Sequence, residues 1–146
     1  MSHKSALIVE DTAANRIFFE RLLQQAGFEV MGVASGKEAL QKASDTASIA
    51  LALIDMEIPD INGLELTYRL RMMFPNICIV VATMHDERSL MQSAFDKGCD
   101  VFLVKPHGFM ELFKQLTTEG TACIREKRPV MIDQYGPRAF KALASK

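Results

Sequence analysis

The feature of this chain that most constrains its fold is a regular alternation between short apolar runs and longer amphipathic stretches. The apolar or β-rich runs are predicted to be five strands, at residues 6–9, 28–33, 49–54, 77–82 and 101–104. The stretches with apolar side chains at helical spacing are predicted to be five helices, at residues 17–26, 35–46, 63–74, 86–97 and from about 107. Gly27 and Gly98 each follow a predicted helix, as glycines that end helices do.

This alternation predicts an α/β fold with a parallel five-stranded sheet and helices on both of its faces, giving three layers. Residues 49–54 and 77–82 are apolar throughout, as expected for strands that are buried on both faces. With 146 residues, 49% of them hydrophobic and 24% charged, one domain with a substantial core is expected. Ligands of such sheets bind beyond the carboxyl ends of the strands, so those ends are where a functional site is sought.

Charge and cysteine content argue against several classes of function. The net charge of −1 gives no sign of a nucleic-acid partner, and no apolar run approaches the ~20 residues of a membrane span. Cys78, Cys99 and Cys123 form no CxxC pair and are odd in number, so neither a disulfide framework nor a zinc site is predicted. With no signal-peptide pattern at the start of the sequence, a cytoplasmic protein is expected.

Polar residues follow four of the predicted strands. Glu10 and Asp11 follow the first strand, Asp55 the third, Thr83 the fourth and Lys105 the fifth. Because parallel strands end along one edge of a sheet, these side chains are predicted to converge. Two carboxylates about 4 Å apart repel by about 4 kcal/mol at an effective dielectric constant of about 20, so three of them need a cation or a shared proton.

Carboxylate oxygens at strand ends that lack His and Cys favour Mg²⁺ over zinc. A metal, a lysine and a nucleophilic carboxylate are the groups that phosphoryl transfer to an aspartate needs. Asp55 is the predicted acceptor, and Lys105 is predicted to bind phosphoryl oxygens as a point charge. Taken singly, Asp11 and Thr83 also fit helix N-caps, and Lys105 also fits a surface lysine.

Four short segments together resemble the receiver domain of two-component response regulators, in the CheY-like superfamily. The segments are residues 8–11 (IVED), 53–59 (LIDMEIP) with Gly63, 82–83 (AT) and 104–106 (VKP). The similarity runs from residue 5 to about residue 118, and the four motifs in this order are specific. It implies a doubly wound, flavodoxin-like (βα)5 fold with strand order 2-1-3-4-5, a receiver domain at 1–118 and a C-terminal extension at 119–146.

The resemblance also implies a Mg²⁺-dependent reaction in which Asp55 accepts a phosphoryl group from a histidine kinase or a phosphotransfer protein. Glu10, Asp11, Asp55 and the backbone carbonyl of Glu57 are the implied metal ligands, with Glu10 acting partly through water. In this interpretation the chain is a signalling switch, with at most weak self-catalysed phosphoryl transfer and autodephosphorylation, rather than an enzyme.

Switching and output are implied in the same way. The Thr83 hydroxyl and Lys105 would bind the phosphoryl group, and Phe102 would turn inward behind Thr83. Met91 and Phe95 have i,i+4 spacing, so they lie on one side of a predicted helix, and we expect a partner or a second copy of the chain to dock there. The alternative is that these two side chains belong to the core.

Two competing functions share part of this pattern. A haloacid-dehalogenase-type phosphatase also uses an aspartate nucleophile and Mg²⁺, but its additional acids come late in the chain, whereas here Glu10 and Asp11 come first. The second alternative is a receiver-like interaction module that does not use phosphate. Only Met84 favours it, because the family has a small residue at that position and a bulky side chain there would hinder access to Asp55.

The extension has a pattern of its own. Residues 121–127 are compatible with a resumed helix, residues 130–132 are apolar and β-prone, and residues 135–137 form a predicted turn. Beyond the turn, apolar side chains at i,i+3,i+4 spacing predict a short helix at 137–145 that folds only by docking on the receiver or on a neighbouring subunit. A frayed tail or linker is the alternative.

Overall fold

The computed structural model of the chain describes residues 4–105 and 108–141. Its strands are β1 (Lys4–Val9), β2 (Phe28–Val33), β3 (Leu51–Asp55), β4 (Cys78–Thr83), β5 (Val101–Val104), β6 (Val130–Asp133) and β7 (Gly136–Ala139). Its helices are α1 (Ala13–Gln25), α2 (Gly36–Ser44), α3 (Gly63–Met73), α4 (Arg88–Asp96), α5 (Phe109–Thr118) and α6 (Gly120–Glu126). None of these helices is both long and apolar enough to cross a membrane.

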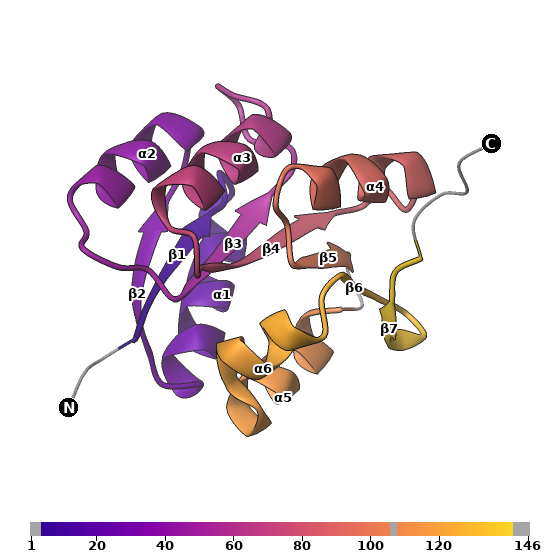
Figure 1. Cartoon of the computed structure of the whole chain (residues 1–146). Helices are drawn as coiled ribbons and strands as arrows, with labels where there is room; N and C mark the ends of the chain where they lie inside the picture. Colours follow the sequence, from indigo (N-terminus) through magenta and orange to yellow (C-terminus); the bar gives the residue numbers. More distant parts are fainter. Residues whose placement is uncertain (1–3, 106–107, 142–146) are drawn as a thin grey trace.

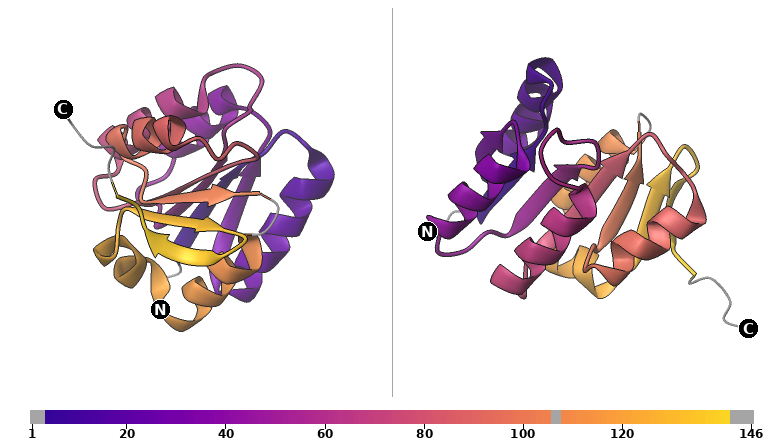
Figure 2. Two further views of the ribbon diagram at one scale, coloured as in Figure 1. Left: turned by 90° about the vertical axis from the view of Figure 1, so that its right-hand side faces the viewer. Right: turned by 90° about the horizontal axis from the view of Figure 1, so that it is seen from above.

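The sheet lies in the middle of the molecule with helices on both of its faces (Figures 1 and 2). Its strand order is β2-β1-β3-β4-β5-β6-β7, and every neighbouring pair is parallel except β6 and β7. Helices α2, α3 and α4 cover one face, and α1, α5 and α6 cover the other (Figure 1). The predicted three-layer α/β fold and the order 2-1-3-4-5 are therefore confirmed for the first five strands.

Alternation along the strands builds two cores, one on each face of the sheet. In β1, Leu7 and Val9 join the cluster under α2, α3 and α4, whereas Ala6 and Ile8 join the cluster under α1, α5 and α6. All residues of β3 and β4 are buried, which is why both segments are apolar up to their last residues. The buried strands hold their carboxyl ends in fixed positions for the side chains that follow.

The C-terminal extension corrects two predictions. The sheet has seven strands rather than five, because β6 pairs in parallel with β5 and β7 returns antiparallel to β6, as seen at the edge of the sheet in Figure 2. The helix predicted at 137–145 is wrong over residues 137–141, of which 137–139 belong to β7 and 140–141 are not helical, and residues 142–146 lie outside the described ranges. A helix of about nine residues is marginal by itself, whereas the edge of β5 offers unpaired backbone groups to β6, and β6 in turn offers its own edge to β7.

Candidate functional site

The candidate site lies at the carboxyl ends of β1, β3, β4 and β5. Asp55 is the last residue of β3 and Thr83 the last of β4, while Glu10 directly follows β1 and Lys105 directly follows β5. The parallel register pairs Asp55 with Ala82 across the sheet, so the ends of β3 and β4 lie level with each other. The backbone N–H of Lys105 donates to the Thr83 carbonyl over 2.7 Å, which fixes the start of the loop after β5.

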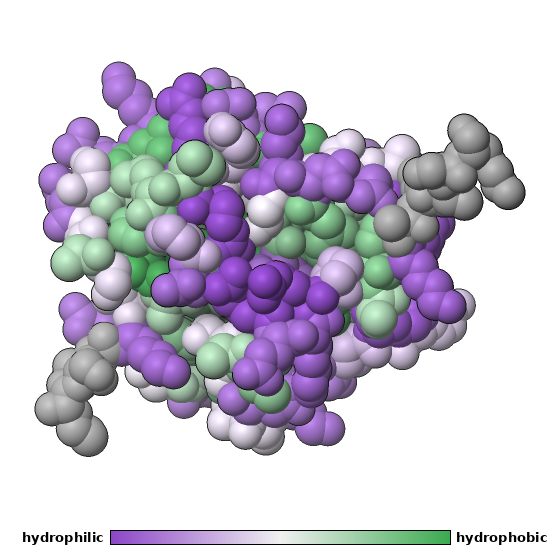
Figure 3. All heavy atoms as spheres, viewed as in Figure 1, coloured by the Kyte–Doolittle hydropathy of each residue, from purple (hydrophilic) through white to green (hydrophobic). Residues whose placement is uncertain are grey.

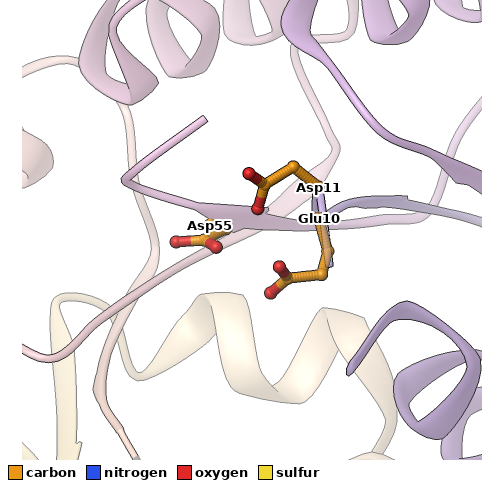
Figure 4. A group of neighbouring side chains, drawn as sticks. All are labelled: Glu10, Asp11 and Asp55. Carbon is orange, nitrogen blue, oxygen red and sulfur yellow. The ribbon is translucent and has the colours of Figure 1, made fainter. Parts of the chain in front are cut away.

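Three carboxylates meet at this edge. Glu10, Asp11 and Asp55 each offer an oxygen, and these oxygens all lie within 4.8 Å of one another. Figure 4 shows the three side chains gathered at the ends of β1 and β3. Glu10 is 2% exposed and Asp55 7% exposed, whereas Asp11 is exposed to solvent. The cluster therefore has two acids held inside the protein and one at its mouth.

Glu10 is the most constrained of the three acids. Its Oε2 accepts a hydrogen bond from the Thr12 N–H over 3.0 Å, and its backbone carbonyl accepts one from the Arg16 guanidinium over 2.7 Å. Its Oε1 is buried and has no hydrogen-bond partner among the described residues. Burial raises the pKa of Glu10, and the negative charge of Asp55 adds to the rise, while the bond from Thr12 and the charge of Lys105 oppose it.

Among the described residues, Lys105 is the only cation that forms an ion pair with these carboxylates. Its Nζ lies 3.3 Å from Asp55 Oδ1 and 3.7 Å from Glu10 Oε1. Asp55 Oδ1 also accepts a hydrogen bond from the Glu57 N–H over 3.1 Å, so its position is set by two donors. One ammonium cannot neutralise three carboxylates, and a site with this excess of hard oxygen ligands fits a divalent cation such as Mg²⁺.

The side chain of Glu57 makes a contact that sequence reasoning missed. Its Oε1 accepts a hydrogen bond from the Thr83 hydroxyl over 3.1 Å and lies 3.4 Å from His85 Nε2. The same hydroxyl accepts a hydrogen bond from the His85 N–H over 3.2 Å. Thr83 itself is fully buried. Its hydroxyl is therefore held by the loops that follow β3 and β4, and no motif in the sequence pairs these residues.

The loop after Asp55 is fixed at several points. The Met56 N–H donates to the Ala82 carbonyl over 2.9 Å. A side chain at Gly63 would come within 3.0 Å of the Met56 backbone, so this close approach requires glycine. Asp60 accepts hydrogen bonds from Gly36 and Lys37 at the start of α2, each over 2.8 Å. The backbone hydrogen bonds from α2 lower the pKa of Asp60.

The predicted output residues are less accessible than expected. Met91 is 2% exposed, so its expected role as a surface contact is wrong, and the alternative that it belongs to the core is correct. Phe95 is half-buried, and its ring lies 4.8 Å from that of Phe140 and 6.4 Å from that of Phe102. Phe102 is fully buried, and its role as a switch stays a prediction.

Phe140 comes from the extension, which reasoning from the sequence assigned to a helix. It is 5% exposed, its N–H donates to the Pro129 carbonyl over 2.9 Å, and the Arg88 guanidinium lies 4.7 Å from the centre of its ring. Arg88 also donates a hydrogen bond to the Lys141 carbonyl. The extension thus covers part of the face of α4 on which a partner was expected. Met84, the bulky residue that was expected to hinder access to Asp55, is 67% exposed to solvent.

Comparisons with known proteins agree with this geometry. The family described as the response regulator receiver domain matches residues 6–117. Chemotaxis protein CheY of Thermotoga maritima is 30% identical over 104 residues, which are 70% of this chain and 86% of that protein. Sporulation initiation phosphotransferase F of Bacillus subtilis is 27% identical over 112 residues, which are 77% of this chain and 90% of that protein.

A solved structure is similar over most of its length. The CheY-like receiver domain protein of Methanospirillum hungatei JF-1 has a TM-score of 0.76 and 26% identity, covering 86% of this chain and 99% of that one. Longer proteins match in part, since the chain spans 27% of the length of a cyclic di-GMP phosphodiesterase of Thermotoga maritima. With its family match, its fold and its acidic strand ends, the chain belongs to the receiver domains of two-component response regulators.

Proposed function

We propose that Asp55 accepts a phosphoryl group from a histidine kinase or a phosphotransfer protein in a Mg²⁺-dependent reaction, and that phosphorylation changes partner binding or dimerisation. The observation that carries the proposal is the acidic cluster itself, in which three carboxylates face a single lysine at 3.3 Å from Asp55. In the transfer, an Asp55 carboxylate oxygen forms a bond to phosphorus as the bond to the donor's histidine nitrogen breaks, and the electron pair stays on that imidazole.

The residues that would hold Mg²⁺ are Asp11, Asp55, Glu10 and the backbone carbonyl of Glu57. The buried Glu10 Oε1 supports this assignment, because it accepts no hydrogen bond from the described residues and Lys105, 3.7 Å away, is shared with Asp55. A metal ion or its water would supply the missing partner. When bound, the ion would neutralise the carboxylates and the incoming phosphoryl oxygens. Lys105 would bind a phosphoryl oxygen from its place beside Asp55.

The switch in this proposal begins at Thr83. Its hydroxyl now donates to Glu57, so binding a phosphoryl oxygen requires that this hydrogen bond be exchanged for one to the phosphoryl group. The contact of Phe95 with Phe102 connects β5 to α4, so a change at the site could reach α4 through these two rings. Output through α4 then involves the docked extension, because Phe140 lies on Phe95. Self-catalysed transfer and autodephosphorylation are proposed to be weak, and the protein is proposed to act in the cytoplasm.

Intact mass spectrometry after incubation with Mg²⁺ and acetyl phosphate tests the acceptor. The protein is expected to gain one phosphoryl group, and Asp55→Asn is expected to gain none, because an amide is a poor nucleophile and a poor Mg²⁺ ligand. Asp45→Asn is a matched control that removes one charge at the exposed end of α2. Uptake by Asp55→Asn at the rate of the unmodified protein, or full uptake in EDTA, would overturn the proposal.

A further inference from the structure

A second charged cluster lies at the opposite, amino end of the sheet. It surrounds Asp100, which directly precedes β5 and is 1% exposed. A pocket of about 350 Å³ opens beside it, between the end of α4 and the segment that follows α6, and its lining includes Phe95, Arg125 and Arg128. Figure 3 shows hydrophilic side chains gathered in the middle of the view, above α6. None of these residues belongs to the proposed phosphorylation site.

The charges in this cluster do not balance. Arg71 Nη2 lies 2.5 Å from Asp100 Oδ2, and Arg125 Nε lies 3.3 Å from Asp100 Oδ1. Arg128 Nε lies 3.7 Å from the same Oδ1. Three guanidinium groups therefore surround one carboxylate, and Asp100 is the only acid that an ion pair joins to them among the described residues. The pocket is left with an excess of positive charge.

Arg71 has no capacity for a further ligand. Its Nε and Nη2 donate to the Gly98 carbonyl, its Nη1 donates to the carbonyls of Pro75 and Ile77, and its Nη2 also donates to Asp100. All five N–H groups of a guanidinium are thereby used. Arg71 is a structural residue that joins the end of α3 to the loop before β5.

Arg125 and Arg128 are different. The guanidinium of Arg125 makes one hydrogen bond to the described residues, from Nε to Asp100. Both Nη groups are therefore without an acceptor among those residues, although the side chain is only 18% exposed. Arg128 donates from Nη1 to the Arg125 carbonyl and leaves Nη2 without an acceptor among the same residues. The partly buried guanidinium of Arg125 and the more exposed one of Arg128 both have unused donors, and such groups are suited to oxyanions.

We propose that this pocket binds a small organic oxyanion, a phosphate ester or a carboxylate, through the Nη groups of Arg125 and Arg128. The pocket volume of about 350 Å³ exceeds the size of a bare inorganic ion, and Phe95 and Pro129 offer apolar contact to the remainder of the molecule. Because Arg125 and Arg128 belong to α6 and the segment after it, whereas Phe95 belongs to α4, a bound anion would also hold the extension against α4.

Titration by nuclear magnetic resonance in Mg²⁺-free buffer tests this site separately from Asp55. The probes are inorganic phosphate, glycerol 3-phosphate and citrate, with glycerol as the uncharged control, and the readout is the amide signals of Gly98, Cys99 and Asp100. We expect glycerol 3-phosphate or citrate to shift these signals in a saturable manner and to bind more tightly than inorganic phosphate. A stronger response to the ester identifies phosphate recognition, and a stronger response to citrate identifies carboxylate recognition.

Variants assign the binding to the two arginines. Arg128→Gln and Arg125→Gln are each expected to weaken binding about tenfold, because each removes charge-assisted hydrogen bonds to the anion. Arg69→Gln removes the same charge from an exposed ion pair on α3 and is expected to leave affinity unchanged. Arg128 is 51% exposed, so its variant keeps the test decisive if Arg125→Gln does not fold. No shift with any probe at millimolar concentration, or an affinity in both pocket variants equal to that of the unmodified protein, would overturn the proposal.

Discussion

At the carboxyl end of the sheet three carboxylates share one lysine, whereas at the amino end three arginines share one aspartate. The buried acids at the two ends differ in how far their charges are compensated. Asp100 accepts from Arg71, from Arg125 and from the Ile79 N–H, so its charge is fully compensated by the chain. Glu10 keeps a buried oxygen without a hydrogen-bond partner among the described residues, and its pKa is raised by burial.

The comparison of Asp100 with Glu10 shows that burial alone does not distinguish a structural charge from a functional one. Asp100 joins α3, β4, β5 and α6 and is complete without a ligand, so its loss should cost stability. Glu10 lies in a cluster in which one lysine is shared by three carboxylates, so its ionisation opposes folding until a further cation binds. Substitutions at the two ends should therefore have opposite effects on the free energy of unfolding.

The largest effect is expected at Asp100. Replacing Asp100 with Ala leaves Arg71 and Arg125 facing each other without a counter-charge, and we expect the free energy of unfolding to fall by about 3 kcal/mol. Urea denaturation measures it. Asp96→Ala removes an acid from the exposed end of α4 and should cost far less. A loss at Asp100 no greater than that at Asp96 would remove the contrast between the two ends.

The next effect concerns Mg²⁺. If the acidic cluster binds the ion, Mg²⁺ at about 100 times its dissociation constant should raise the free energy of unfolding by about 2.7 kcal/mol. Glu10→Gln should raise stability in Mg²⁺-free buffer and reduce the gain from Mg²⁺, because it removes a desolvated charge and a metal ligand. Denaturation curves with Mg²⁺ or with EDTA measure both. Equal stability with and without Mg²⁺ in the unmodified protein would contradict a cation site.

A smaller effect is expected where the extension joins the receiver. Phe140→Ala removes an aromatic ring that is buried against Phe95. We expect the free energy of unfolding to fall by about 2 kcal/mol, and no further because β7 can detach locally while the rest of the protein stays folded. Hydrogen exchange of the β6 amides and the melting temperature report it. Tyr135→Ala, which removes a ring that is 75% exposed in the same hairpin, is the control. Unchanged exchange in Phe140→Ala would show that the ring does not hold the extension in place.

The smallest effect is expected at Asp60, in the loop beside the acidic cluster. Its pKa is lowered by the N–H groups of α2, so the carboxylate contributes stability above the unfolded value of about 3.8 and loses that contribution as the pH falls through the lowered pKa. Asp60→Ala should therefore lower the melting temperature slightly at pH 7, and the difference should shrink in acid. A difference that is independent of pH would mean that the charge of Asp60 plays no part.

The acidic site was predictable because each of its residues follows a strand. Glu10, Asp55, Thr83 and Lys105 come directly after apolar segments or end them, and parallel pairing brings such ends to one edge whatever the loops do. The bond between Thr83 and Glu57 was not predictable, because it depends on how two loops lie relative to each other. The cluster around Asp100 was not predictable either, because the three arginines that surround it are spread over more than fifty residues of sequence.

The sequence alone was enough to predict the alternation of strands and helices, the first five strands of the sheet and the set of side chains at their carboxyl ends, because these follow from local hydrophobic periodicity. The tertiary structure alone settled the conformation of residues 137–140, where weak helical spacing lost to the open edge of β6 and to the ring of Phe95. It also decided that Met91 is core and that the arginines near Asp100 meet. These outcomes depend on contacts between segments that are far apart in the chain, which local patterns do not encode.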